Sequence, residues 1–191
     1  MRPACFIIDD WGAPAPRLAA MADHMAGKGS RVAWFDYGNG EDLHNRLQEE
    51  YYRVRADGGA AILAAGAGIA GALALAAQLP VTRLALVQGP WRAGVTPSRS
   101  LRRLEGFARR NLAICTAKTL IVADDLSMRS LGSLARRMPG AEVMALAWPR
   151  DPASELCTNR ENCLKTRLGD FLRTGELRKP LAENAEMCII V

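Results

Sequence analysis

The chain has 191 residues, a formal net charge of +5 and 49% hydrophobic residues, which suffice for one domain with a substantial core. It has no uninterrupted apolar run of about 18 residues, so the sequence does not predict a membrane-spanning helix. Its five cysteines, an odd number without a C-x-x-C pair, indicate reduced thiols and a cytoplasmic location and argue against a zinc site.

Apolar, strand-like runs alternate with amphipathic helical patterns from the N-terminus onward. The first predicted strand, Cys5–Asp9, precedes a helix at Pro16–Gly27 that glycines end. The second strand, Arg31–Asp36, precedes a helix that Asp42 can cap and that extends to Arg55. The apolar face of this second helix comprises Leu43, Leu47, Tyr51 and Val54.

The segment Ala60–Pro80 combines an apolar strand, a glycine-rich turn and an Ala/Leu helix. The turn reads Gly66-Ala67-Gly68-Ile69-Ala70-Gly71, and we place Gly68 at its apex. A strand that turns sharply into a helix presents backbone N–H groups and the positive end of the helix dipole at one point. A ligand or a nucleophile is therefore expected above this turn.

The second half of the chain continues the alternation. Its predicted elements are a strand at Leu84–Val87, a loop at Gly89–Ser98, a basic helix with Leu101, Leu104, Phe107 and Leu112 inward, a strand at Thr119–Ala123, a helix at Ser127–Met138, a strand at Glu142–Ala147 and a helix at Leu164–Arg173. This order predicts one α/β domain over residues 1–175, doubly wound, with a mostly parallel sheet of about six strands.

Residues 176–191 are expected to form an irregular tail with an apolar end. That end, Cys188-Ile189-Ile190-Val191, suits an edge strand or the groove of a partner. It also has the C-a-a-X form of a lipidation signal, so that alternative stays open.

The runs CFIIDDWG, RVAWFDYGNG, ILAAGAGIAGALALAAQLP and RLALVQGP together resemble the core of the α/β-hydrolase family, entered at its third strand. In that family the first of these strands leads to His-Gly-x-Gly and the glycine-rich turn is the nucleophile elbow, G-x-S-x-G-G. The resemblance covers residues 5–173 and implies a trimmed α/β-hydrolase domain.

The same resemblance implies that the catalytic serine and histidine are missing. Gly68 stands where the family has serine, and a glycine cannot form an acyl intermediate. The two histidines, His24 and His44, belong to the first two predicted helices, and none follows Trp148. We therefore expect a pseudoenzyme, a non-hydrolytic binding or accessory protein, rather than an ordinary serine hydrolase.

Carboxylates follow several predicted strands, at the edge where parallel sheets bind ligands. Asp9 and Asp10 occupy the place of the oxyanion hole, where they would repel an oxyanion, and Asp124 or Asp125 matches the triad acid. These residues are candidates for lining a pocket. They could support unusual carboxylate chemistry, or the two pairs together could hold Mg²⁺.

A rival interpretation treats the glycine turn as the G-x-G-x-x-G of FAD or NAD proteins. Gly66, Gly68 and Gly71 would then approach a pyrophosphate, and Gln88 would stand where an acidic residue holds the ribose. Under the hydrolase resemblance no resident cofactor is expected.

Positive charge is concentrated between Arg83 and Arg137, a segment that contains eleven basic residues and only three acidic ones. Arg99, Arg102, Arg103 and Arg110 fall opposite the apolar side of the basic helix, which predicts either a docking face for an acidic protein partner or a solvated surface. Aromatic residues do not interleave with this cluster, so nucleic acid is not a predicted partner. A small ligand above the glycine turn is the other expected partner.

Overall fold

A computed structural model describes residues 3–9, 16–37, 42–55, 58–87, 99–124, 133–139, 141–146, 155–176 and 189–190. At 16–17, 123–124, 142–146, 155–164 and 189–190 it describes the backbone alone.

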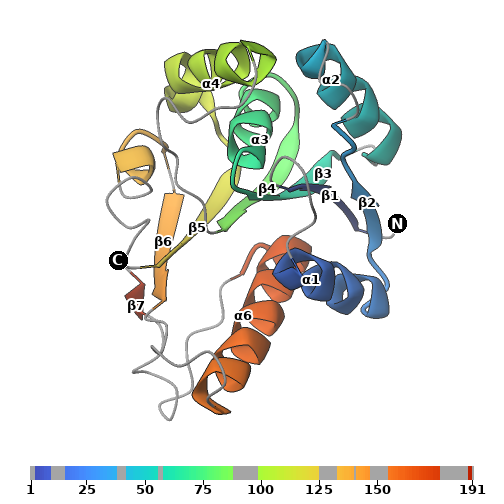
Figure 1. The fold of residues 1–191 in the computed structure, drawn as a ribbon, viewed down its shortest axis with the longest axis vertical. Helices are drawn as coiled ribbons and strands as arrows, with labels where there is room; N and C mark the ends of the chain where they lie inside the picture. Colours follow the sequence, from blue (N-terminus) through green and yellow to red (C-terminus); the bar gives the residue numbers. More distant parts are fainter. Residues whose placement is uncertain are drawn as a thin grey trace.

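One mixed sheet forms the centre of the molecule (Figure 1). Its strands, within the described ranges, are β1 (Ala4–Ile8), β2 (Arg31–Trp34), β3 (Ala60–Ala65), β4 (Val81–Val87), β5 (Lys118–Asp124), β6 (Ala141–Leu146) and β7 (Ile189–Ile190). They are ordered β2-β1-β3-β4-β5-β6-β7, and all neighbouring pairs are parallel except β6 and β7. The predicted α/β fold with a mostly parallel sheet is confirmed.

Helices cover both faces of this sheet (Figure 1). One face carries α2 (Leu43–Val54), α3 (Gly68–Ala76) and α4 (Arg99–Asn111), and the other carries α1 (Pro16–Gly27) and α6 (Glu155–Thr174). A 3₁₀ turn at Leu112–Ile114 extends α4. The bounds predicted for α1 match those of the structure, and the four predicted apolar residues of α2 are all buried.

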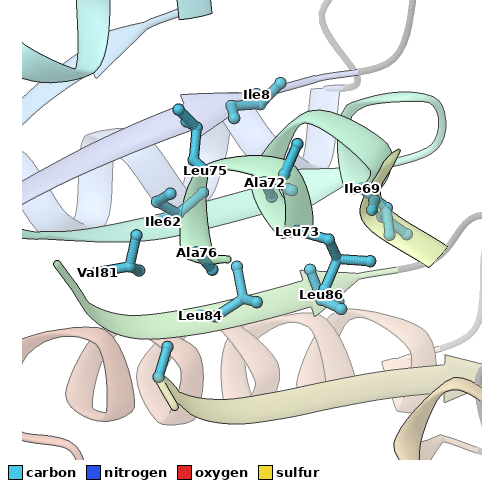
Figure 2. Close-up of a cluster of buried hydrophobic side chains, with 14 of the residues drawn as sticks. Ile8, Ile62, Ile69, Ala72, Leu73, Leu75, Ala76, Val81, Leu84 and Leu86 are labelled. Atoms are coloured by element: carbon cyan, nitrogen blue, oxygen red, sulfur yellow. The ribbon is translucent and has the colours of Figure 1, made fainter. Parts of the chain in front are cut away.

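Strand residues alternate between two hydrophobic clusters, one under each helical layer. On β1, Phe6 and Ile8 join the cluster beneath α2, α3 and α4, whereas Cys5 and Ile7 join the cluster beneath α1 and α6. Every residue of α3 is buried. Figure 2 shows this helix lying across β3 and β4, with Leu73 close to Leu86. The glycine-turn helix is thus the central element of its layer.

Two predicted elements begin several residues earlier in the structure than expected. The fourth strand begins at Val81 rather than Leu84. Val81 and Thr82 are β-branched, which favours a strand, and Val81 pairs with Ala60 of β3. The last helix begins at Glu155 rather than Leu164, because its polar first half contains no proline or glycine to interrupt it. The helix predicted over Ser127–Met138 lies largely outside the described residues.

Asp42 does not cap α2 as the sequence predicted. It adopts a left-handed conformation (φ 46°) and forms no side-chain hydrogen bond to the helix backbone. Instead, its Oδ2 accepts a hydrogen bond from Asn45 Nδ2 at 2.8 Å. The first turn is closed by the backbone bond from the Arg46 N–H to the Asp42 carbonyl.

The apolar end of the chain adds a short strand to the sheet. Ile189 and Ile190 pair antiparallel with Ala145 and Met144, which confirms the expectation of an edge strand. These two residues therefore depart from the irregular tail predicted over 176–191, while Cys188 and Val191 lie outside the described residues. Within the described part of the chain, no helix is long and apolar enough to cross a membrane.

Tyr51 connects α2 to two strand ends from inside the core. Its hydroxyl accepts a hydrogen bond from the Ala60 N–H (2.9 Å) and donates to the Pro80 carbonyl (2.7 Å). Burial raises the pKa of this phenol above its ordinary value. The hydroxyl thus satisfies backbone groups at the starts of β3 and β4 that would otherwise lack a partner.

We expect Tyr51→Phe to lower the free energy of unfolding by about 1–3 kcal/mol, because the buried Ala60 N–H loses its acceptor. Urea denaturation measures the change. Tyr52→Phe is the matched control, since Tyr52 is 48% exposed, and it should change stability by less than about 0.5 kcal/mol. Equal effects of the two variants would contradict this role of Tyr51.

Candidate functional site

The glycine-rich segment is a strand-to-helix turn, as predicted, but its apex differs from the predicted one. β3 ends at Ala65, Gly66 has a positive φ of 53°, and α3 already begins at Gly68. The apex therefore lies at Gly66 and Ala67, and the placement of Gly68 there was wrong by two residues. A left-handed backbone favours glycine, which accounts for Gly66.

Gly68 is required by a close contact between α3 and β1. A Cβ atom at this position would overlap the carbonyl oxygen of Ile8 and lie 2.7 Å from that of Asp9. At Gly71 a Cβ would lie 3.1 Å from Cδ1 of Leu47 on α2. The space next to both glycines is filled by the protein itself.

This packing argues against the dinucleotide interpretation. In a G-x-G-x-x-G site the second glycine leaves room for the pyrophosphate, but here the β1 backbone occupies that room at Gly68. Sheet order disagrees as well, because dinucleotide folds of the order 3-2-1-4-5-6 place the glycine turn after their first strand, whereas here it follows β3. The proposed ribose contact, Gln88, lies outside the described residues.

The topology nevertheless places the turn where parallel sheets bind ligands. The chain proceeds from β1 to β2 in one direction and from β3 to β6 in the other, so the direction switches between β1 and β3. Ligands occupy the crevice at the carboxyl ends of strands at such a switch point. Gly66 follows β3 there, and Asp9 follows β1, whose Ile8 is paired with Ala64.

Asp9 is held at this edge by the segment after β2. Asp9 is 5% exposed, and its carbonyl accepts a hydrogen bond from the Tyr37 hydroxyl at 2.6 Å. Arg46 on α2 donates to the carbonyls of Asp36 (2.6 Å) and Tyr37 (2.5 Å) and so fixes that segment. Sequence reasoning missed Tyr37 and Arg46, because nothing local shows that residues 28 positions apart will meet.

The two predicted carboxylate pairs belong to strands that are not neighbours in the sheet. β3 and β4 lie between β1 and β5, so three strand spacings of about 4.8 Å separate the backbones that carry Asp9 and Asp124 by roughly 14 Å. A shared Mg²⁺ has ligands at about 2.1 Å, so this strand spacing argues against the predicted site, which stays a prediction because most of its residues are not described. Asp10, Asp125 and the side chain of Asp124 lie outside the described parts of the chain.

Neither histidine is placed beside the turn at Gly66. His44 Nε2 is 2.8 Å from Nε2 of Gln78, beyond the end of α3 opposite to the turn, and its ring packs on Phe107. His24 lies on the other face of the sheet, where it packs against Gly169 of α6.

The two described cysteines are poor nucleophiles. Burial raises the pKa of Cys5 to about 12 and also raises the pKa of Cys115. A thiol with such a pKa is almost fully protonated at neutral pH, and the thiolate is the reactive form. Together with the placement of the histidines, this leaves the described residues at the turn without an activated thiol or a histidine base.

The predicted basic face is the exposed side of α4. Arg99, Arg102, Arg103 and Arg110 are exposed, and none forms an ion pair with a described residue. The inward residues are Leu101, Leu104, Ala108 and Leu112, while Phe107, predicted inward, is only half-buried against His44. Arg110 Nη1 lies over Gly106, 3.5 Å from where a Cβ would be, and so points back along the helix.

Comparisons with known proteins identify the fold. No family model and no curated protein matches the sequence. A monoacylglycerol lipase from Paleococcus ferrophilus superposes with a TM-score of 0.65 at 11% identity, covering 88% of this chain and 96% of that one. The enol-lactonase from Burkholderia xenovorans LB400 gives a TM-score of 0.56 at 17% identity, with 90% and 92% covered.

A further solved structure, of metagenome-derived lipolytic enzymes, gives a TM-score of 0.61 at 13% identity, covering 90% of this chain and 94% of that one. A putative hydrolase of the α/β superfamily from Xanthomonas campestris gives 0.59 at 17% identity, with 91% and 99% covered. At these identities the likeness shows the fold alone. The chain has the α/β-hydrolase fold, as the sequence motifs predicted.

Within this fold, the geometry corrects the register of the elbow motif. The catalytic serine of G-x-S-x-G occupies the strained residue of the turn, with small residues two positions before and after it. In this chain the residue of positive φ is Gly66, flanked at those positions by Ala64 and Gly68. The motif therefore fits the backbone of this turn better with Gly66 than with Gly68 at its central position, and Gly66 carries no side chain.

We expect Gly68→Ala to lower the free energy of unfolding by about 3 kcal/mol or more, because the new methyl group meets backbone that cannot rotate away. Gly66→Ala should cost about 1–2 kcal/mol, the strain of a left-handed alanine. Urea denaturation of the two variants compares them directly. If Gly66→Ala lowers the free energy of unfolding more than Gly68→Ala does, the assignment is contradicted. Gly66 would then make the close packing contact and Gly68 would be the apex of the turn.

Proposed function

We propose that the chain is a non-hydrolytic protein of the α/β-hydrolase fold that acts as a binding or accessory protein. The observation that carries this proposal is Gly66, which stands at the nucleophile position without a hydroxyl or a thiol. Covalent catalysis of the hydrolase type needs an activated side chain at that point. The solved structures of similar fold include lipases and a lactonase, but one fold hosts many functions.

The surroundings of Gly66 support the same conclusion. His44 is engaged with Gln48 and Gln78, and His24 packs beneath the opposite helical layer, so neither can serve as the base at the turn. Asp9 occupies the place where the family stabilises an oxyanion, and a carboxylate there disfavours a developing negative charge. The sheet edge at the switch point is still suited to binding a small ligand without catalysis.

The exposed side of α4 supports binding of an acidic protein partner. Glu105, the acidic residue of this helix, is paired with Arg109 at 2.9 Å, so it does not neutralise the four outward arginines. Arg137 donates to the Arg109 carbonyl at 2.8 Å and brings a further positive charge to the end of the helix. Opposite potentials steer two proteins together and fix their register.

A second candidate function is an enzyme that uses carboxylate chemistry without a covalent intermediate. Asp9 favours it, because this residue is 5% exposed and follows β1 at the switch point. Asp124 is the last residue of β5, which lies three strands from β1, and it would contribute only to a wide site.

We expect the purified protein not to turn over p-nitrophenyl esters above background and not to be labelled by a fluorophosphonate probe. Gly66→Ser should remain inactive in both assays, since neither histidine of the chain lies beside the turn to activate the new hydroxyl. An active serine hydrolase provides the positive control. Labelling of the wild-type chain at a serine would overturn the assignment of the elbow, and turnover lost in Asp9→Asn would favour the second candidate.

The docking face is tested by reversing charge on α4. We expect Arg102→Glu/Arg103→Glu to lose the partner that the wild-type chain captures, with stability changed by less than about 0.5 kcal/mol. The identified partner should also dissociate as salt rises, because exposed charges are screened within about 8 Å at physiological ionic strength.

The matched control is Arg53→Glu/Lys118→Glu, which changes the net charge equally at exposed positions away from α4. It should retain the same partner, identified by mass spectrometry. If Arg102→Glu/Arg103→Glu retains that partner, the four arginines are a solvated surface and not a docking face.

A further inference from the structure

Arg167 is a charged residue inside the layer between α6 and the sheet. The residues that follow it on α6 and face the sheet, Leu168, Phe171 and Leu172, all belong to the hydrophobic cluster beneath α1 and α6. Arg167 itself is only 8% exposed. Its guanidinium is therefore largely removed from water, unlike those of the arginines on α4.

The position of Gly169 shows on which side of α6 this arginine lies. A Cβ at Gly169 would be 3.0 Å from the His24 ring and 3.9 Å from Met25, so that residue faces α1. Two residues along a helix differ in direction by about 200°. Arg167 therefore lies on the flank of α6 turned away from α1.

The guanidinium has no partner on that flank among the described residues. Its Nη1 is buried and donates no hydrogen bond, and none of the ion pairs between described residues includes Arg167. Asp170, the carboxylate one turn along the helix, pairs with Arg173 at 3.2 Å. The carbonyls of Leu172 and Arg173 at the end of α6 accept hydrogen bonds from Arg83, a different arginine.

An unpaired buried arginine has no means of relieving its charge. A buried lysine or carboxyl group loses its charge through a shifted pKa, but arginine stays protonated at every pH that a folded protein experiences. A water molecule could accept the Nη1 hydrogen bond, yet it would leave the positive charge uncompensated. Buried charges in proteins are paired for this reason.

We propose that Arg167 binds the oxyanion of a small ligand, a carboxylate or a phosphate, on the flank of α6 turned away from α1. The planar guanidinium forms two parallel hydrogen bonds with such a group, and these strengthen when water is excluded. The site lies on the face of the sheet opposite to α3 and α4. It is therefore independent of the function proposed for the turn at Gly66 and for the basic face.

Thermal unfolding of the full chain tests the site, with chloride replaced by sodium acetate or by inorganic phosphate at constant pH and ionic strength. The unfolding midpoint of the wild-type protein should rise and saturate with at least one of these anions, because a ligand of the native state stabilises it. Arg167→Met should lose the response. Arg167→Lys should need at least a tenfold higher anion concentration, because it lacks the planar fork.

Arg136→Met is the matched control, since it removes one arginine at an exposed position and leaves the pair between Asp170 and Arg173 intact. It should keep the wild-type response. If Arg167→Met is more stable than the wild type and neither protein responds, the guanidinium is simply unpaired and the proposal fails. If Arg167→Met is less stable and the wild type does not respond, a carboxylate of the chain itself compensates the charge, and the proposal again fails.

Should Arg167→Met not fold, the side-chain Nε–H signal of Arg167 decides the question. This NMR signal is assigned in the wild-type protein by its loss in Arg167→Lys. It should shift with added phosphate or acetate and saturate over the range in which the unfolding midpoint rises. A signal that both anions leave unchanged would overturn the proposal.

Discussion

The contact between the start of α3 and the end of β1 is the constraint on which the rest of this structure depends. Gly68 permits it, because a side chain there would overlap the carbonyl of Ile8. The contact holds α3 across β3 and β4 and so allows all nine of its residues to be buried. It also holds β1 and β3 together at the switch point, where Asp9 and Gly66 stand at one edge.

The same close contact limits the chemistry at that edge. The backbone of β1 fills the space that a pyrophosphate would need beside Gly68, and Gly66 provides no side chain at the strained position. Among the described residues this edge carries Asp9, whose carbonyl accepts a hydrogen bond from the Tyr37 hydroxyl. The α/β-hydrolase fold is therefore maintained by packing, and the described residues of the turn place no hydroxyl or thiol at the strained position.

Local signals in the sequence were sufficient for the fold and insufficient for the site. The bounds of α1 and the buried face of α2 followed from helical periodicity and from glycine at the helix end. The elbow register did not follow, because glycines at 66 and 68 fit the same motif in two ways and only the positive φ of Gly66 separates them. The bond from Tyr37 to Asp9 and the burial of Arg167 depend on tertiary neighbours that no local pattern encodes.

The arginines of this chain differ in how far their charges are exposed to water, and therefore in whether they need a partner. Those on the outer side of α4 are hydrated, and salt screens them, so the protein tolerates them whether or not a partner is bound. Arg167 is 8% exposed and cannot lose its proton, so its burial has a free-energy cost that hydration does not offset. A charge density visible in the sequence is thus weaker evidence of binding than one buried cation, because a buried cation without a partner has a desolvation cost that an exposed one does not.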